Sequence, residues 1–135
     1  MNFSAIGDIQ NLSGSIKGGS VMLNSREGNI VNKTLSKSLE IEHNVGKEHY
    51  TLINKIASIE ATKGTLVVNA AKNIETVGAD LRGKDGITLQ AGEDVTMKTL
   101  KEERNYDYTF YNGHAKGESV VHLQSNVQSE GLIDV

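Results

Sequence analysis

The stretch from Thr65 to Thr96, TLVVNAAKNIETVGADLRGKDGITLQAGEDVT, decides the fold. It contains one pattern twice: alternating apolar residues that end on alanine, followed by Asn or Asp and a further apolar residue. Each member of the second copy stands 21 residues after its counterpart, so that Leu66, Val68, Ala70, Asn73 and Ile74 are followed by Ile87, Leu89, Ala91, Asp94 and Val95. Apolar residues at alternate positions predict short strands with one buried face.

Further copies lie on both sides of this stretch. Leu23, Ser25, Asn29 and Ile30 form a third copy with one residue inserted, and Phe3, Ala5, Asp8 and Ile9 form a fourth. A second pattern, apolar-x-small-x-apolar, alternates with the first at residues 12–16, 77–81 and 123–127. A unit of about 21 residues with two or three short strands buries its apolar face only by stacking on its neighbours.

We therefore predict an all-β fold, a right-handed parallel β-helix (solenoid) with coils of about 21 residues, in which residues 1–135 form a single β-helical unit. Stacking at roughly 4.8 Å would align equivalent residues in ladders. The predicted ladders are Leu66 on Ile87 on Ile133, and Val68 on Leu89 on Val135. The absence of proline and the presence of 14 glycines also favour paired strands separated by turns.

The composition narrows the classes of function. The 135 residues carry a formal net charge of -3 with acids and bases interspersed, so no basic field indicates a nucleic-acid partner. No apolar run is long enough to cross a bilayer, and the first residues lack the basic-then-apolar pattern of a signal peptide. The lack of cysteine excludes disulfides and thiolate metal sites. We expect no nucleic-acid partner and no membrane span.

One position of the repeat carries Asp8, Asn29, Asn73 and Asp94. Side-chain oxygens on successive coils suit calcium, but such residues also satisfy backbone groups in turns. We favour the backbone role, because the glycine-aspartate nonapeptides of calcium-binding β-rolls are missing. The four histidines lack the spacing of a helical zinc pair. We predict neither a metal nor a cofactor.

The repeat is interrupted twice. Residues 38–54, SLEIEHNVGKEHYTLIN, alternate apolar and polar side chains on both sides of Asn44 to Lys47. Residues 98–122 do likewise, with Asn112-Gly113 as the turn. Alternation around such turns is typical of a β-hairpin. We predict two extrahelical β-hairpins that project from the body.

Aromatic residues gather in these interruptions. Five of the six lie there, namely Tyr50, Tyr106, Tyr108, Phe110 and Tyr111. Tyrosine offers apolar area with a polar tip, so these five are candidate contact residues for a protein or glycan partner. The alternative is that the rings fold down and cover an outer face of the helix.

Three strings carry a family resemblance: LVVNAAKNIETVGADL, GITLQAGEDVTM and VVHLQSNVQSEGLIDV. They resemble the haemagglutinin repeats of filamentous haemagglutinins and of contact-dependent growth inhibition exoproteins, whose Ala-Gly-x-Asp-Ile turn is matched by AGEDV and AAKNI. The resemblance is weakest over residues 31–54. It implies a long β-helical shaft, secretion to the bacterial cell surface, and passage through the outer-membrane transporter of a two-partner secretion system.

By this resemblance we expect a non-enzymatic shaft segment of a large secreted or surface-attached adhesin (haemagglutinin-like) that mediates cell or host contact. Its partner would be a receptor or glycan on a host or neighbouring bacterial cell. The alternative is the shaft or translocation region of a contact-dependent toxin-delivery exoprotein. We see no transport domain and no C-terminal toxin, and we expect an interior slice of the shaft.

Two further alternatives come from other classes of protein. One is a polysaccharide-active β-helix enzyme, because pectin-cleaving lyases use the same architecture. Such an enzyme needs clustered carboxylates and a basic residue in a groove. Only Asp80, Glu93 and Asp94 recur in coil register, and the arginines Arg26, Arg82 and Arg104 fall in turns or insertions. The other alternative is self-association through the unpaired edge strands at the ends of the helix.

Overall fold

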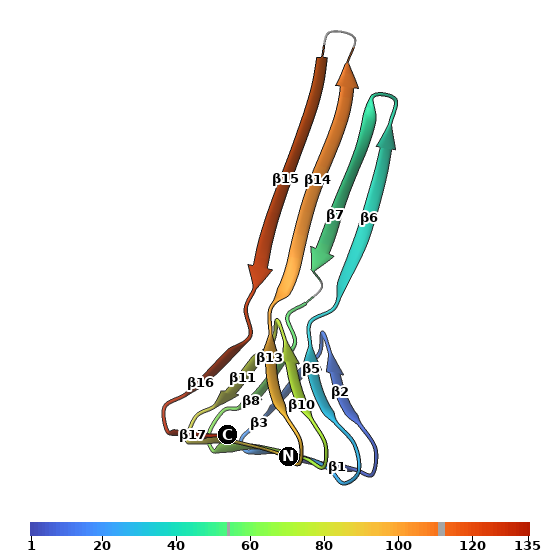
Figure 1. Ribbon diagram of the computed structural model, residues 1–135. Coiled ribbons are helices and arrows are strands. Elements are labelled where there is room, and N and C mark those ends of the chain that lie inside the picture. The colour runs from blue at the N-terminus through green and yellow to red at the C-terminus, as the bar shows by residue number, and fades with distance from the viewer. Residues whose placement is uncertain (54, 111–112) are drawn as a thin grey trace.

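The computed structural model describes residues 1–53, 55–110 and 113–135, apart from the side chains of His43, Glu102, Glu103, Arg104, Tyr106, Phe110, His114, Ser119 and Val121. All regular elements in these ranges are β-strands, which confirms the all-β class. Figure 1 shows two parts, a body made of short strands and a sheet of long strands that stands away from it.

Three parallel sheets make up the body. In spatial order, sheet A contains β1 (Asn2–Ala5), β4 (Val21–Ser25), β9 (Thr65–Ala70), β12 (Gly86–Ala91) and β17 (Leu132–Asp134). Sheet B contains β2 (Ile9–Leu12), β5 (Ile30–Lys33), β10 (Ile74–Val77) and β13 (Val95–Lys98). Sheet C contains β3 (Ser15–Gly18), β8 (Ser58–Ala61), β11 (Asp80–Gly83) and β16 (Asn126–Ser129).

The chain visits these sheets in a fixed order. It runs from sheet A to B to C four times and then returns to sheet A at β17. We call each passage a coil and number the coils 1 to 4. Consecutive strands of every sheet come from consecutive coils, so segments far apart in the sequence lie side by side along the body (Figure 1).

The pairing of Cα atoms confirms the predicted spacing of 21 residues. Sheet A aligns Leu66, Ile87 and Ile133 in one row and Val68 and Leu89 in the next. The same sheet pairs Leu23 with Val68 across the copy that has one residue inserted. Val135 departs from the prediction, because it follows the last strand and is 71% exposed.

The apolar faces of the three sheets meet in one core. Its buried members are Val21, Leu23, Ile30, Ile59, Ala61, Leu66, Val68, Ala70, Ile74, Leu81, Ile87 and Leu89. Each of these side chains is at most 2% exposed. Full burial of such a side chain contributes about 1.5 to 3 kcal/mol, so every coil depends on the ones above and below it.

Sheets B and C are connected in two ways. Coils 1 and 3 turn a tight corner at a residue in the left-handed region, Ser13 with φ 49° and Gly78 with φ 54°. Coils 2 and 4 open the same corner and insert a hairpin there. Tight and opened corners therefore alternate along the body.

The two hairpins form one antiparallel sheet, which we call the blade. Its strands are β6 (Ser36–His43), β7 (Gly46–Ile53), β14 (Leu100–Phe110) and β15 (Gly113–Leu123), in the order β15-β14-β7-β6. The hairpins are joined through β7 and β14, where Gly46 to Tyr50 pair with residues 104–108.

The blade occupies the segments in which we predicted separate hairpins at 38–54 and 98–122. In the first, His43 pairs with Gly46 across a two-residue turn. In the second, Asn112 of the predicted turn lies outside the described residues. The pairing between the hairpins was not predicted, since strands pair through backbone groups that every residue has.

Replacing Leu89 with Asp should unfold or aggregate the protein. Leu89 is 1% exposed, so the substitution puts a charge into the stacked core and removes about 1.5 to 3 kcal/mol of burial. Leu132→Asp is the matched control, because Leu132 is 78% exposed. Thermal melts of both variants check this, and equal melting temperatures would contradict the register of sheet A.

Replacing Gly78 with Ala should lower the free energy of unfolding by about 1 to 2 kcal/mol, because L-residues are strained in the left-handed region. The added Cβ would also lie 2.7 Å from the Cβ of Leu100, at the base of the second hairpin. Gly19→Ala serves as control, since a Cβ there meets nothing within 4 Å. Urea titrations compare the two, and a neutral Gly78→Ala would argue against the tight corner.

Candidate partner-contact surface

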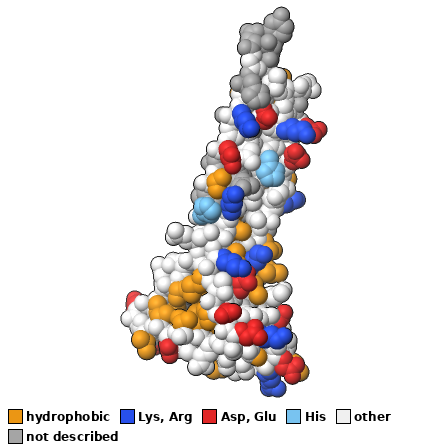
Figure 2. All heavy atoms as spheres, viewed as in Figure 1, with side chains coloured by type: hydrophobic (Ala, Val, Ile, Leu, Met, Phe, Trp, Pro, Cys, Tyr) orange, Lys and Arg blue, Asp and Glu red, His pale blue; other side chains and the backbone are white. Residues whose placement is uncertain are grey.

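Register assigns the residues of the blade to two faces, because directly paired residues point to the same side of a sheet. The aromatic face carries Leu39, Ile41, Glu48, Tyr50, Leu52 and Tyr108. The polar face carries Glu40, Glu42, Lys47, His49, Asn105, Asp107, Lys116 and Glu118. Figure 2 looks onto a side of the blade where charged and histidine side chains gather.

Glu48 lies between two tyrosines on the aromatic face. Tyr50 donates a hydrogen bond from its hydroxyl to Oε2 of Glu48 at 3.2 Å. Tyr108, from the other hairpin, donates to Oε1 of the same carboxylate. All three side chains are half-buried. One carboxylate therefore links two tyrosines that lie 58 residues apart in the sequence, and with them the two hairpins.

Two of the five predicted contact residues, Tyr50 and Tyr108, thus lie together. Tyr106 and Phe110 belong to β14, but their side chains are outside the described residues, as is the whole of Tyr111. Sequence reasoning missed Glu48. The available signal was its phase, because in β7 it stands at the alternate position otherwise taken by Tyr50 and Leu52.

The aromatic face exposes apolar surface beside these tyrosines. Ile41 is 38% exposed and pairs with Glu48, and Leu52 is 48% exposed and stands two residues after Tyr50 in β7. Apolar area next to hydroxyls and a carboxylate suits contact with a partner that offers both apolar and hydrogen-bonding groups. The contact role of Tyr50 and Tyr108 stays a prediction.

Charges of opposite sign alternate across the polar face. One row of paired residues runs Glu42, Lys47, Asp107, Lys116 through all four strands. Lys47 Nζ lies 3.3 Å from Glu42 Oε1. Opposite charges on directly paired residues each stabilise a sheet by about 0.2 to 1 kcal/mol, so this row favours the observed register.

A hollow of about 270 Å³ lies over the polar face between β7, β14 and β15. Asn105 lines it, and the Oδ1 atom of Asn105 is buried without a hydrogen-bond partner in the described part of the chain. The charged side chains of the polar face that also line this hollow are Lys47, Asp107, Lys116 and Glu118.

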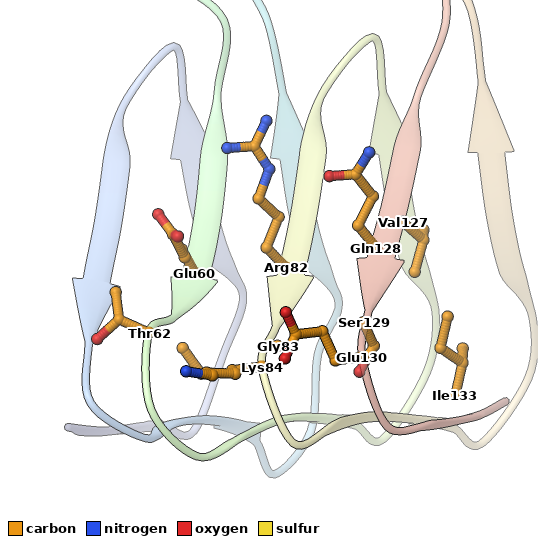
Figure 3. A pocket seen from close by; sticks show the side chains of 11 residues that line it. Glu60, Thr62, Arg82, Gly83, Lys84, Val127, Gln128, Ser129, Glu130 and Ile133 are labelled. Carbon is orange, nitrogen blue, oxygen red and sulfur yellow. The ribbon is translucent and has the colours of Figure 1, made fainter.

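A shallow groove of about 670 Å³ runs along the outside of sheet C. Figure 3 shows Glu60, Arg82 and Gln128, from adjacent strands, pointing the same way. We expected Arg82 in a turn, but it lies in β11, where Nη2 is 3.2 Å from Oδ2 of Asp80. Glu60 in turn has Lys17 Nζ at 3.9 Å. Two of the acids at this groove, Glu60 and Asp80, are therefore paired with bases of the sheet.

The residues at the repeated Asx position form a ladder at the corner between sheets A and B. The backbone N–H of Asn29 donates to Asp8 Oδ1 at 2.7 Å, that of Asn73 to Asn29 Oδ1 at 3.0 Å, and that of Asp94 to Asn73 Oδ1 at 3.0 Å. Asp8, Asn29 and Asn73 thus each accept a hydrogen bond from the next coil. This is the backbone role favoured over calcium binding.

No group of three or more His, Cys, Asp or Glu residues among the described residues is placed to hold a metal ion. None of the described segments forms a helix of the length and apolarity that crossing a membrane requires.

The fold and the blade define a class, a repeat protein of stacked parallel strands with a projecting antiparallel sheet. No family model matches the chain, and no solved structure matches it. It is 33% identical over 103 residues, 74% of the chain, to a tRNA nuclease CdiA of Escherichia coli. It is 35% identical over 125 residues, 89% of the chain, to a Toxin CdiA of Escherichia coli.

A 16S rRNA endonuclease CdiA of Enterobacter cloacae is 37% identical over 83 residues, 60% of the chain. The chain belongs to the family of contact-dependent growth inhibition exoproteins. It matches 3%, 4% and 2% of the lengths of these three relatives, so it corresponds to a small part of each.

Two expectations are overturned by these relatives. We predicted a protein that is not an enzyme and has no nucleic-acid partner, whereas the relatives are named tRNA nuclease and 16S rRNA endonuclease. The physical reason is one of scale. A net charge of -3 describes 135 residues and carries no information on what a much longer protein acts on.

Replacing Asn73 with Asp should lower the free energy of unfolding by about 1 to 3 kcal/mol. Nδ2 of Asn73 donates to Asn29 Oδ1 and to Glu93 Oε2, both at 3.1 Å, and a carboxylate cannot donate either bond. Asp94→Asn is the matched control, because it keeps an acceptor at the end of the ladder. Urea unfolding at neutral pH distinguishes the two, and equal stability would mean that the two hydrogen bonds donated by Asn73 Nδ2 do not stabilise the fold.

Proposed function

We propose that this chain is a segment of the stalk of a secreted, cell-surface protein that delivers a toxin by contact between bacteria. Its similarity to Toxin CdiA over 89% of its length carries this proposal. The names of the relatives favour toxin delivery over the adhesin that we first expected. Adhesion then becomes a step within delivery.

The stalk would be a right-handed parallel β-helix in which residues 1–135 form one unit. The fixed order of sheets A, B and C supports this, because each coil adds one strand to every sheet. Buried residues from all three sheets, such as Leu66, Ile74 and Leu81, face a common interior. Each coil of about 21 residues lengthens such a stack by about 4.8 Å. Since each coil contacts only its neighbours, further coils lengthen the stalk without changing the packing of the others.

The blade would be the lateral contact surface of this stalk. It stands away from the body (Figure 1), and its strands carry the candidate residues Tyr50, Tyr106, Tyr108 and Phe110. The fifth candidate, Tyr111, lies outside the described residues. Loops inserted into a rigid repeat body are common places for binding residues, since they vary without disturbing the core.

Exchanging this chain for its matching segment in Toxin CdiA of Escherichia coli tests the proposal. The chimera should still inhibit target cells in coculture, and Leu89→Asp within it should abolish inhibition while Leu132→Asp does not. Replacing β14 and β15 by a two-residue corner like Ser13-Gly14 should keep the chimera on the cell surface and reduce inhibition. Full inhibition by the Leu89→Asp chimera would contradict the stalk, and full inhibition without the hairpin would contradict the contact surface.

A further inference from the structure

The outer face of sheet A differs from the outer faces of the other two sheets of the body. Along its strands, buried residues such as Leu89 alternate with residues that point outward. None of the outward residues of β1, β4, β9 and β12 is charged, and all of them belong to the described residues. Sheet B, in contrast, carries the pair Lys98 and Glu75 outward, and sheet C the pair Arg82 and Asp80. Because protein surfaces normally intersperse charges of both signs, a sheet face without charge is a candidate binding surface.

The register sorts the residues of this face into two rows that run along the body. The amide row consists of Asn24, Asn69 and Gln90, which pair in that order across β4, β9 and β12. The apolar row consists of Met22, Val67 and Thr88, which pair across the same three strands. Neighbours within a row are one strand spacing apart, about 4.8 Å, and the two rows are separated by roughly 6 to 7 Å of strand. The face thus sets a line of hydrogen-bonding groups beside a line of methyl-bearing groups.

The amide row is open to a ligand. Asn69 and Gln90 are exposed, and Asn24 is half-buried. Within the described residues none of these three side chains forms a hydrogen bond, whereas the amide of Asn73 is bound to Asn29 and Glu93. Each carboxamide can donate two hydrogen bonds and can accept at its oxygen. A ligand that fits the row must therefore offer both donors and acceptors at short, regular intervals.

The apolar row supplies contact area beside the amides. Met22 is 43% exposed, and its partner Val67 is half-buried. Together with Thr65 they line a shallow hollow of about 450 Å³ at the start of β4 and β9. Two carboxylates lie at the borders of the face, Asp85 in a turn that lines the hollow and Asp134 in β17. Carboxylates accept hydrogen bonds from hydroxyls and repel anions, so they favour an uncharged ligand over an acidic one.

The chemistry of the face selects a neutral glycan among the classes of partner. The cores of protein interfaces are rich in aromatic residues and arginine, and none of these points outward from β1, β4, β9 or β12. Nucleic acid requires basic side chains, which the face also lacks. A sugar ring carries hydroxyls that both donate and accept along its edge, and apolar C–H groups on its faces. A polysaccharide repeats these groups along its length, as the stacked coils repeat the two rows.

We infer that the outer face of sheet A binds an uncharged polysaccharide that lies along the body. The site faces away from the blade, because the hairpins leave the body at the corner between sheets B and C, and sheet A closes the opposite side (Figure 1). It uses the outward side chains of the coils and not their edges, so coils stacked above and below would lengthen it. The inference does not depend on the contact role of the blade.

Electrophoresis of the 135-residue chain through native gels that contain soluble polysaccharides tests this inference. Dextran, galactomannan and hydroxyethylcellulose are the neutral probes, and alginate and heparin are the charged ones. At least one neutral probe should slow the chain, and the charged probes should not. Gln90→Ala should weaken the binding about fivefold, because it removes one hydrogen-bonding side chain from the amide row. Gln128→Ala is the matched control, since it makes the same change at an exposed position of sheet C and should leave binding unchanged.

Both glutamines are exposed, so thermal melts of the two variants should match that of the unaltered chain and assign any loss of retardation to binding. Retardation by none of the neutral probes, equal retardation by the charged probes, or equal effects of the two variants would overturn the inference. Sedimentation velocity tests for a second copy as the partner. Association that depends on concentration and is weakened by Gln90→Ala would make the face a contact between copies and would also overturn it. None of these results would bear on the role of the segment in toxin delivery.

Discussion

The distance between hydrogen-bonded strands, about 4.8 Å in every sheet, is the constraint on which the arrangement of this protein depends. The body advances by one strand per coil, whereas a hairpin occupies two strand positions. Hairpins in successive coils would therefore compete for the same space in the blade. Alternation with tight corners removes this conflict. The glycine at position 78 reflects this close packing, since its Cα faces the base of the second hairpin and leaves no room for a Cβ.

Opening a corner leaves backbone N–H and C=O groups without a partner in any sheet. Buried polar side chains supply the missing hydrogen bonds. Thr34 Oγ1 donates to the carbonyl of Gly78 at 2.7 Å and accepts from the N–H of Ala57 at 2.9 Å. Asn32 Nδ2 donates to the carbonyl of Asp80 at 3.0 Å. Thr34 is 0% and Asn32 2% exposed, so their polarity would be costly without these partners. The side chains bind neighbouring coils to each other where the strands are interrupted.

The sequence predicts the part of the fold that repeats. Leu66 and Ile87 stack as expected, because a buried apolar ladder leaves the same residue type at the same spacing in each coil. The joining of the two hairpins leaves no such trace, since strands pair through backbone groups that every residue has. Two weaker features of the sequence are consistent with the joining of the hairpins, but they can be interpreted only once the register is known. Glu48 in the apolar phase of β7 is one, and the alternating charges of Glu42, Lys47, Asp107 and Lys116 are another. Arg82 was misplaced because a strand of four residues is too short for alternation to separate it from a turn.

Because the two hairpins are paired, a contact surface on the blade would be built by both of them. Two independent loops could vary separately, but Glu48 accepts hydrogen bonds from Tyr50 in its own hairpin and from Tyr108 in the other. A substitution at any of these three residues therefore alters a surface built by both insertions. The surface is in turn held by coils 2 and 4, whose separation is set by coil 3. The position of the candidate contact residues thus depends on the stacking of the body beneath them, so the blade and the body form a single mechanical unit.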